Sequence, residues 1–413
     1  MTRRSTALVA GAGIIGIACA IELQKRGFQV TLVDPQPPGS QTSMGNAGGF
    51  GFTEVMPIGG PGVLWRLPGW LLDPLGPLSL RWSHLPAMLP WLWRFHRASS
   101  DHQVERISNA LSALLRRSIE DTHNLVAETG LQYLLTANGA ITVYETEQSR
   151  SKDDLEWKIK KQCGVQVEPI DAVQIRQMEP ALSNVSCGYY TPEWENTTDP
   201  FKLAQQLAAA FVQRGGDILR NKVVGFKPGA LPQPVFATDI TGKWDKVIIS
   251  AGIWSAKLCR QLGEAVTMES ERGYNTTLPS PDLTLNRQII FGDRKFVATQ
   301  MDSGIRIGGA AEFAGIDAPA NYQRSDRLMQ IARHYLPSLN TEGGTAWMGH
   351  RPSTPDSLPV ISASTKHHGL YYAFGHGHLG LTTAATTGLL ISQLACGETP
   401  GVDMGPYAIA RFR

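Results

Sequence analysis

A short glycine-rich run near the start of the chain has the spacing of a phosphate-binding turn. In such a Gly-x-Gly-x-x-Gly pattern the first glycine permits a tight turn and the second lets a pyrophosphate approach the backbone. The third allows close packing of a helix on a strand, and the helix N-terminus offers free N–H groups to the phosphates. The run predicts a dinucleotide site, and it consists of Gly11, Ala12, Gly13, Ile14, Ile15 and Gly16.

Two polar segments follow this run. Asp34 is placed to accept hydrogen bonds from ribose hydroxyls, which favours FAD or NAD over NADP and does not choose between them. The segment Ser43–Gly49 is rich in small residues, which let backbone amides approach a ligand, and Ser43 and Asn46 could add polar contacts. Taken alone, this segment could equally be a flexible loop.

The elements around these residues predict a βαβ unit. Residues 6–10 are β-prone, residues 14–26 have helical spacing and are closed by Gly27, and residues 29–33 form a second strand that ends in Asp34. Two strands joined through a helix are expected to be parallel. Asp34 and the glycine run would then lie at the same edge of a sheet.

Helices and strands alternate along the rest of the chain without an internal repeat or a long linker. This arrangement indicates two interleaved domains, one assembled from both ends of the chain and one inserted twice. We expect helices at 104–128, 149–162, 201–214 and from about 379 to 395, and strands within 132–145, at 247–250, within 285–310 (antiparallel) and at 370–374.

Composition excludes several classes of protein. The chain has 413 residues, a formal net charge of +2 and five scattered cysteines. The small charge argues against a nucleic-acid partner, and cysteines without paired spacing argue against disulfides, a zinc site or an iron–sulfur cluster. Arg3 and Arg4 precede an apolar run, which we interpret as part of the mature fold and not a signal peptide. Without about 20 uninterrupted apolar residues, a cytoplasmic protein is expected, with peripheral attachment to the inner face of the cytoplasmic membrane left open.

At this point the sequence resembles the D-amino-acid dehydrogenase family, within the amine-oxidising flavoproteins that include D-amino-acid oxidase and glycine oxidase. The likeness covers nearly the whole chain and implies FAD. It includes the Asn46-Ala47-Gly48 loop beside the flavin, a Trp/Pro/Leu insertion at 57–97, the Gly-x-Arg-Pro-x-Thr-Pro-Asp motif within 347–356 and the C-terminal flavin loop at 375–382.

The resemblance implies an α/β fold with an α+β substrate part. A Rossmann-like FAD-binding domain would be interleaved with a substrate-binding domain built on an antiparallel sheet. The expected bounds are 1–56, 150–265 and 340–413 for the FAD-binding domain, and 57–149 and 266–339 for the substrate-binding domain.

The resemblance also implies roles for individual residues. Arg351 would bind the substrate carboxylate, because a guanidinium grips a carboxylate with two hydrogen bonds and keeps its charge when desolvated. Gly349 stands where related sarcosine oxidases carry the cysteine that bonds flavin, so FAD is expected to be non-covalent. The remaining expected cofactor contacts are Val224, Ala251, Gly252 and Trp254 near the adenine and pyrophosphate, and Gly375, Gly377, His378, Leu379, Gly380, Leu381 and Thr382 near the pyrimidine end of the flavin.

Three residues have more than one interpretation. Tyr274 could lie over the substrate, hydrogen-bond its carboxylate, or be a packed strand tyrosine. The backbone carbonyl of His378 aligns with one that accepts a hydrogen bond from the substrate amine. Neither His376 nor His378 is needed as a catalytic base, because a neutral amine can lose its α-hydrogen as hydride directly to flavin.

Together these observations predict an FAD-dependent D-amino-acid dehydrogenase, with D-proline or a hydroxy-D-proline as a candidate substrate and a quinone or another non-oxygen acceptor. The alternative in the same fold is a glycine or sarcosine oxidase that produces hydrogen peroxide. A catalytically silent FAD-binding scaffold and an NAD-dependent dehydrogenase explain fewer of the motifs. The five tryptophans within 57–97 either pack inside the substrate domain or touch a membrane.

Overall fold

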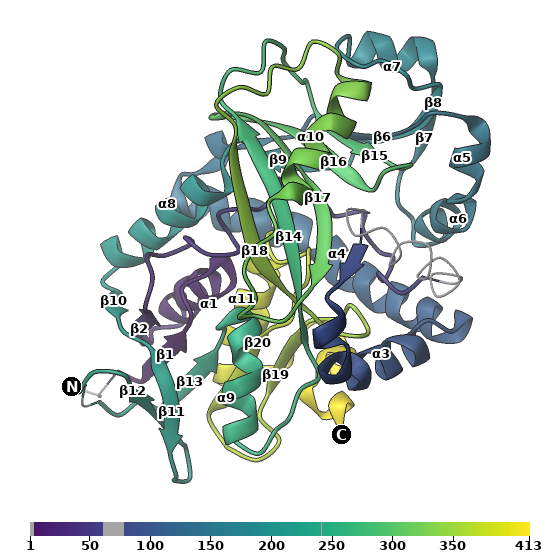
Figure 1. The fold of residues 1–413 in the computed structure, drawn as a ribbon. Coiled ribbons are helices and arrows are strands. Elements are labelled where there is room, and N and C mark those ends of the chain that lie inside the picture. Colours follow the sequence, from purple (N-terminus) through teal and green to yellow (C-terminus); the bar gives the residue numbers. More distant parts are fainter. Residues whose placement is uncertain (1–3, 61–77, 241) are drawn as a thin grey trace.

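A six-stranded sheet forms the first layer of the computed structural model, which describes residues 4–60, 78–240 and 242–413 (Figure 1). Its strands pair in parallel except at one edge, where the last strand is antiparallel to its neighbour. In order across the sheet they are β10 (Asp217–Arg220), β2 (Gln29–Asp34), β1 (Thr6–Ala10), β13 (Lys246–Ile249), β20 (Leu370–Phe374) and β19 (Val360–Ala363).

The predicted βαβ unit is confirmed. Helix α1 spans Ile14–Lys25, and β1 pairs in parallel with β2 so that Ala10 lies opposite Val33. The inner residues of both strands are largely buried, as expected for a parallel sheet covered on both faces. The carboxyl ends of the two strands therefore bring the glycine run and Asp34 to one edge of the sheet.

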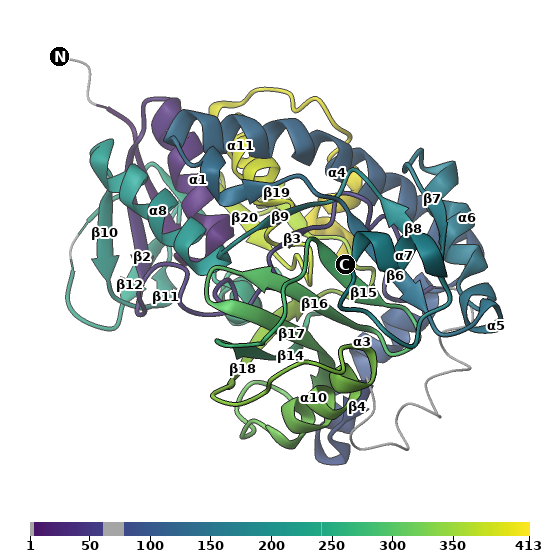
Figure 2. The same ribbon diagram turned by 90° about the horizontal axis from the view of Figure 1, so that it is seen from above.

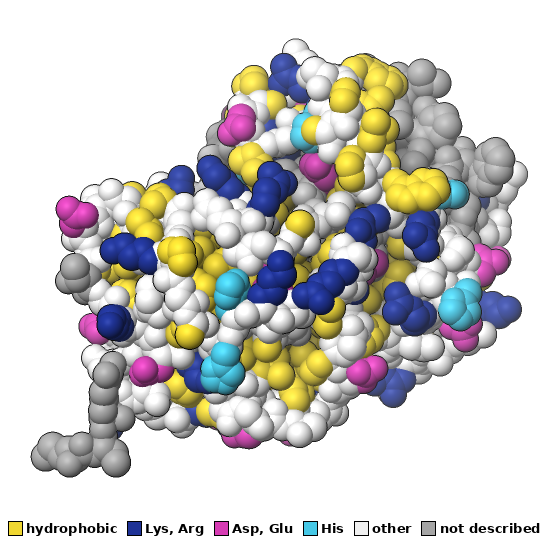
Figure 3. Space-filling model, turned by 90° about the horizontal axis from the view of Figure 1, so that it is seen from below, with side chains coloured by type: hydrophobic (Ala, Val, Ile, Leu, Met, Phe, Trp, Pro, Cys, Tyr) yellow, Lys and Arg dark blue, Asp and Glu magenta, His cyan; other side chains and the backbone are white. Residues whose placement is uncertain are grey.

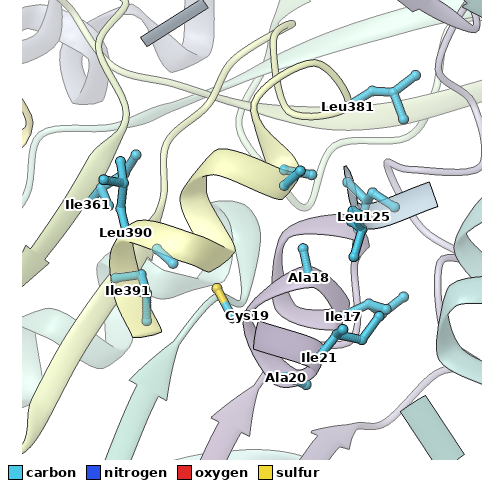
Figure 4. Packing of buried hydrophobic residues seen from close by; sticks show 14 of the residues in the cluster. Ile17, Ala18, Cys19, Ala20, Ile21, Leu125, Ile361, Leu381, Leu390 and Ile391 are labelled. Carbon is cyan, nitrogen blue, oxygen red and sulfur yellow. The ribbon is translucent and has the colours of Figure 1, made fainter. Parts of the chain in front are cut away.

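Helices cover both faces of this sheet. On one face α1 and α8 (Pro200–Gln213) share a core with α11 (Ala384–Cys396) and the long helix α4 (Asp101–Thr129). A Cβ atom at Gly388 would lie 2.7 Å from the backbone of Ala18, so α1 and α11 cross with their backbones in contact. Figure 4 shows Ala18 and Cys19 facing α11. The other face packs against α9 (Ser255–Gln261) and the hairpin of β11 (Val223–Lys227) and β12 (Gln233–Phe236).

A second, larger sheet is mostly antiparallel, as predicted for residues 285–310; only β15 with β6 and β17 with β4 pair in parallel. Figure 2 shows this sheet between α10 (Gln323–Tyr335) on one side and α4 with α11 on the other. Its strands are β18 (Thr345–Ser353), β14 (Glu269–Leu278), β17 (Gly304–Phe313), β16 (Phe296–Met301), β15 (Gln288–Phe291), β6 (Ala140–Tyr144), β8 (Cys187–Thr191) and β7 (Glu168–Asp171), with β4 (Leu78–Leu80) beside β17.

Sheet membership departs from the expected domain bounds in three places. Helix α4, expected with residues 57–149 of the substrate-binding domain, packs in the core of the first sheet. Strands β7 and β8, expected within 150–265, and β18, expected within 340–413, belong to the second sheet. The reason is pairing between distant segments, since β8 pairs with β6 and β18 with β14.

Some predicted elements are shorter or divided. Residues 149–162 form two helices, α5 (Glu147–Ser151) and α6 (Asp154–Gln162). The helix expected from about residue 379 begins at Ala384, and the residues before it form a turn. The remaining short elements are α7 (Ala172–Met178) and a small sheet of β3 (Gly49–Phe50), β9 (Glu195–Thr197) and β5 (Leu135–Thr136).

The segment 57–97 is only partly described, and Trp65 and Trp70 lie outside the described residues. Its helix α3 (Leu85–Ala98) buries Trp91, whose Nε1 donates to the Ser353 carbonyl over 3.0 Å. In contrast, Trp82 and Trp93 are 65% and 64% exposed. Trp91 is therefore packed inside the protein, as one interpretation expects, whereas membrane contact through Trp82 and Trp93 stays a prediction. No helix of the described ranges is long and apolar enough to cross a membrane.

Candidate active site

A cavity of about 680 Å³ lies where the two sheets meet and is lined by residues of both. Of the predicted site residues, only Gly16, Gly48 and Gly375 do not line it. Those that do are Gly11, Gly13, Ile14, Ile15, Asp34, Ser43, Asn46, Ala47, Val224, Ala251, Gly252, Trp254, Tyr274, Arg351, Gly377, His378, Leu379, Gly380, Leu381 and Thr382.

The glycine run forms one end of this cavity. Gly11 has a φ of +114°, and a Cβ atom there would lie 2.4 Å from the Ser250 carbonyl oxygen, so only glycine suits the turn. A Cβ atom at Gly16 would lie 1.8 Å from the Gly11 oxygen, which explains why this glycine shapes the turn without facing the cavity. The run thereby leaves an open cradle at the N-terminus of α1.

Two polar side chains complete this end. The Asp34 carboxylate accepts hydrogen bonds of 2.8 Å from the backbone N–H groups of Ala12 and Gln36, and burial raises its pKa. The Ser43 hydroxyl oxygen accepts the Ile14 N–H over 3.0 Å, which joins the predicted loop to the start of α1. Each Asp34 oxygen keeps lone-pair capacity for a further donor from the cavity.

The segment Ser43–Gly49 is held by side chains of the second sheet. Arg306 donates to the carbonyls of Met44 and Asn46 over 3.0 and 2.6 Å, and Asn275 donates to the Gly45 carbonyl over 2.8 Å. Burial lowers the pKa of Arg306. Sequence reasoning missed both residues, because nothing local marks an arginine in a strand as the partner of a loop some 260 positions earlier.

Trp347 packs against the two glycines on either side of it. A Cβ atom added at Gly45 would lie 2.0 Å from the Trp347 indole, and one added at Gly349 would lie 1.9 Å from it. A cysteine at position 349 could therefore not be accommodated unless Trp347 moved. None of the five cysteines of the chain lines the cavity, in keeping with the expected non-covalent cofactor.

Arg351 lines the cavity from strand β18 of the second sheet. Its Nη1 is 2.8 Å from Oε1 of Glu271, its cross-strand neighbour on β14. The guanidinium extends over Gly273, where a Cβ atom would lie 2.6 Å from Cζ. The second Glu271 oxygen is buried and accepts no hydrogen bond from the part of the chain that the structure describes. Arg351 keeps free N–H groups for a ligand, and its side chain is 27% exposed to the cavity.

The C-terminal loop brings His378 near Arg351 and Glu271. The Gly377 N–H donates to the Pro352 carbonyl over 3.0 Å, and Ser353 bridges to His376, so this loop is tied to the strand that carries Arg351. The His378 side chain is exposed on the cavity wall. Its partial desolvation by the surrounding protein lowers its pKa, and the Glu271 and Glu54 carboxylates oppose this shift.

Two other predicted groups are already bonded within the protein. Burial lowers the pKa of His376 to about 3, and its Nε2 lies 3.0 Å from the Thr387 hydroxyl. The Tyr274 hydroxyl donates to Glu312 over 2.6 Å and accepts the Asn321 N–H over 3.0 Å. These contacts favour the packed-strand interpretation of Tyr274.

A second charged pair, of which only Glu54 lines the cavity, was not expected from the sequence. The Lys160 ammonium is 2.9 Å from Oε1 of Glu54 and 3.0 Å from Oε1 of Glu156. Glu54 lines the cavity, and Lys160 is buried behind it. The pair joins residues 106 positions apart, so no local pattern could have revealed it.

Comparison with known proteins shows which family the chain belongs to. Residues 6–394 match the family described as DAO, FAD dependent oxidoreductase. The chain belongs to this family. Over 98% of its length it is 34% identical to a D-amino-acid oxidase of Bradyrhizobium diazoefficiens, of which it covers 98%. It is 30% identical, over 98% of its length and 99% of the relative, to a D-amino acid dehydrogenase of Rhizobium rhizogenes.

Solved structures of DAO-type enzymes share the fold. A glycine oxidase from Bacillus cereus superposes with a TM-score of 0.71 at 19% identity, covering 96% of each chain. An L-proline dehydrogenase from P. horikoshii superposes with a TM-score of 0.74 at 18% identity, covering 100% of this chain and 98% of that one.

The residues present fit the FAD on which the family depends. The cradle at the glycine run and the spare acceptor capacity of Asp34 suit a pyrophosphate and a ribose. Val224, Trp254, the segment after Ser43 and the C-terminal loop all contribute to the lining of the same cavity. The chain is therefore an FAD-dependent oxidoreductase, and the residues expected to contact its cofactor line one cavity together with Arg351.

Proposed function

We propose that this oxidoreductase oxidises a D-amino acid to an imino acid, which water then converts to a keto acid and ammonia. The observation that carries the proposal is Arg351, a guanidinium with free N–H groups on the wall of the cavity that fits FAD. Full-length relatives named for D-amino acids support the choice of enantiomer.

Bound FAD supplies a two-electron acceptor for the hydrogen on the substrate α-carbon. Arg351 binds the carboxylate, and the His378 carbonyl accepts a hydrogen bond from the neutral amine. The α-hydrogen leaves as hydride, the amine nitrogen donates its lone pair to form the C=N bond, and no protein base is needed. Orientation by Arg351 and His378 supplies the acceleration that the protein itself contributes.

We infer further that electrons pass to a quinone or another acceptor in place of oxygen, and that cyclic substrates such as D-proline or a hydroxy-D-proline are candidates. A second candidate function is an oxidase that reacts with oxygen, because the 34% identical relative is named an oxidase. Glycine and N-alkyl glycines would then be added to the possible substrates. Formation of hydrogen peroxide separates the two functions.

A dehydrogenase that reduces a membrane quinone would need to approach a lipid surface. Exposed Trp82, Leu89 and Trp93 lie in or just before α3, beside exposed Arg81 and Arg97. Figure 3 shows basic side chains scattered among hydrophobic ones over the lower face of the molecule. Aromatic and basic groups together favour an anionic interface. Sedimentation with anionic vesicles tests this contact: loss of binding in Trp82→Ser/Trp93→Ser supports it, and equal binding of the variant contradicts it.

The decisive experiment follows flavin bleaching without oxygen. Paired D- and L-amino acids, both hydroxyprolines, glycine and sarcosine are mixed with the holoenzyme. Rapid bleaching by a D-enantiomer, with slow recovery in air and fast recovery with a quinone, is the expected result. Fast recovery in air with peroxide formation would establish the oxidase. Bleaching by no amine would refute the proposal.

A further inference from the structure

Glu54 occupies a fixed place on the wall of the cavity. The chain around it is tied to the C-terminal loop, because the Gly51 N–H donates to the Thr382 hydroxyl oxygen over 3.0 Å. Glu54 itself packs over Gly51, where a Cβ atom would lie 2.9 Å from the Glu54 Cγ. The Glu54 carboxylate therefore lines the cavity from a segment that is hydrogen-bonded to the loop carrying His378.

One oxygen of the Glu54 carboxylate accepts a hydrogen bond from a buried lysine. Lys160, only 3% exposed, donates to Glu54 Oε1 over 2.9 Å, bonds Glu156 and lies 4.7 Å from the centre of the Trp157 ring. The other Glu54 oxygen accepts no hydrogen bond from any residue that the structure describes. A carboxylate fixed at one oxygen and open at the other is organised to receive a donor from the cavity.

The charges around this end favour a cation. Arg351, Lys160 and the cavity-lining Lys295 carry three positive charges. Glu54, Glu156, Glu271 and Asp153, the partner of Lys295, carry four negative ones, so the set has a net charge of −1. A substrate carboxylate on Arg351 lowers this to −2 while the α-amine is neutral. A positive group elsewhere on the substrate would offset this charge, whereas a second negative group would increase it.

We propose that Glu54 is a specificity-determining residue that binds a hydrogen-bond donor on the substrate side chain, with cationic side chains bound most tightly. The inference rests on the proposed function and names its substrate class: D-amino acids with an amino or guanidino side chain, followed by hydroxylated ones. Lys160 acts as a positioning residue that aims the carboxylate.

The test compares D-lysine with D-norleucine, which has the same carbon chain without the ammonium group. In the wild-type holoenzyme, kcat/KM for D-lysine should exceed that for D-norleucine by about 10- to 100-fold, the range of one charge-assisted hydrogen bond. In Glu54→Gln the ratio of the two kcat/KM values should fall toward one, mainly because KM for D-lysine rises. The kcat/KM for D-glutamate should increase relative to those for D-lysine and D-norleucine.

Glu156→Gln is the matched control. Glu156 also bonds Lys160 but does not line the cavity, so its loss should leave the ratio within about 3-fold of the wild type. An equal fall in both variants would overturn the inference, as would a wild-type ratio near one. If D-norleucine bleached the flavin and Glu54→Gln kept the wild-type ratio of the two kcat/KM values, the inference would be contradicted and the proposed function would still hold. Bleaching by no D-amino acid would remove both.

Discussion

The ion pair between Arg351 and Glu271 allows the proposed carboxylate clamp to be separated from a structural salt bridge. Arg351→Met removes the guanidinium and leaves the Glu271 carboxylate, 8% exposed, without the one side-chain partner it has among the described residues. The free energy of unfolding should fall by about 1–3 kcal/mol, toward the lower figure because the Arg351 side chain is 27% exposed. The double variant Arg351→Met/Glu271→Gln replaces the unpaired charge by a neutral amide and should recover most of this loss.

Catalysis should behave differently. Two charge-assisted hydrogen bonds to a substrate carboxylate contribute about 3–6 kcal/mol together. In Arg351→Met the ratio of the flavin reduction rate constant to the substrate Kd should therefore fall by roughly 10²- to 10⁴-fold. The double variant should lose as much, because neither side chain replaces the guanidinium.

Thermal unfolding and stopped-flow reduction by the best D-amino acid measure the two quantities on the same preparations. Glu271→Gln alone is the control and should keep Arg351 available to substrate. If the double variant recovered its reduction rate together with its stability, Arg351 would be a structural residue and the clamp would be refuted.

Three further perturbations address the cofactor end and the histidines. Asp34→Ala removes the carboxylate that orders the turn at Ala12 and should weaken FAD binding by at least about 10-fold, measured by the fluorescence of released flavin. Arg306→Met releases the loop carbonyls and should alter the flavin absorption bands and lower FAD retention, whereas an unchanged spectrum would show that the loop is held by other contacts. His376 has a pKa of about 3 in the folded protein, so between pH 3 and about 6.5 the unfolded state binds the extra proton. The stability of the wild type should therefore rise by roughly 2 kcal/mol from pH 5 to pH 7, and denaturant titrations should show a smaller rise in His376→Gln.

The cofactor end could be predicted because its information is local. The glycine run, the helix after it and Asp34 lie within 24 successive residues, and their spacing follows from the geometry of one βαβ unit. The structure adds a contact that spacing does not reveal, the bond from Ile14 to Ser43. That bond is an interaction of a predicted loop with a predicted helix, so it refines the expectation without changing it.

The substrate end could be predicted only in part because it depends on long-range register. The resemblance identified Arg351, but its partner Glu271 is set by which residues of β14 and β18 lie opposite each other. Tyr274 illustrates the limit, since its environment depends on Glu312 of another strand and on Asn321 before α10. For the same reason β8 and β18 belong to a sheet that the expected domain bounds did not assign to them, because their pairing partners come from distant segments.

The difference between the cofactor end and the substrate end has a physical basis, which also determines how substrate specificity can change. FAD is recognised largely by backbone groups at a turn, which tolerate many side chains as long as the glycines remain. The proposed substrate site contains two ion pairs instead, Arg351 with Glu271 and Lys160 with Glu54, which join residues 80 and 106 positions apart. A single substitution at Glu54 or Glu271 would change the charge that a substrate meets and leave the turn, the strand pairing and the cofactor contacts as they are. Relatives with the same fold and different named substrates are the expected consequence, and the substrate of this chain is best sought by varying side-chain charge.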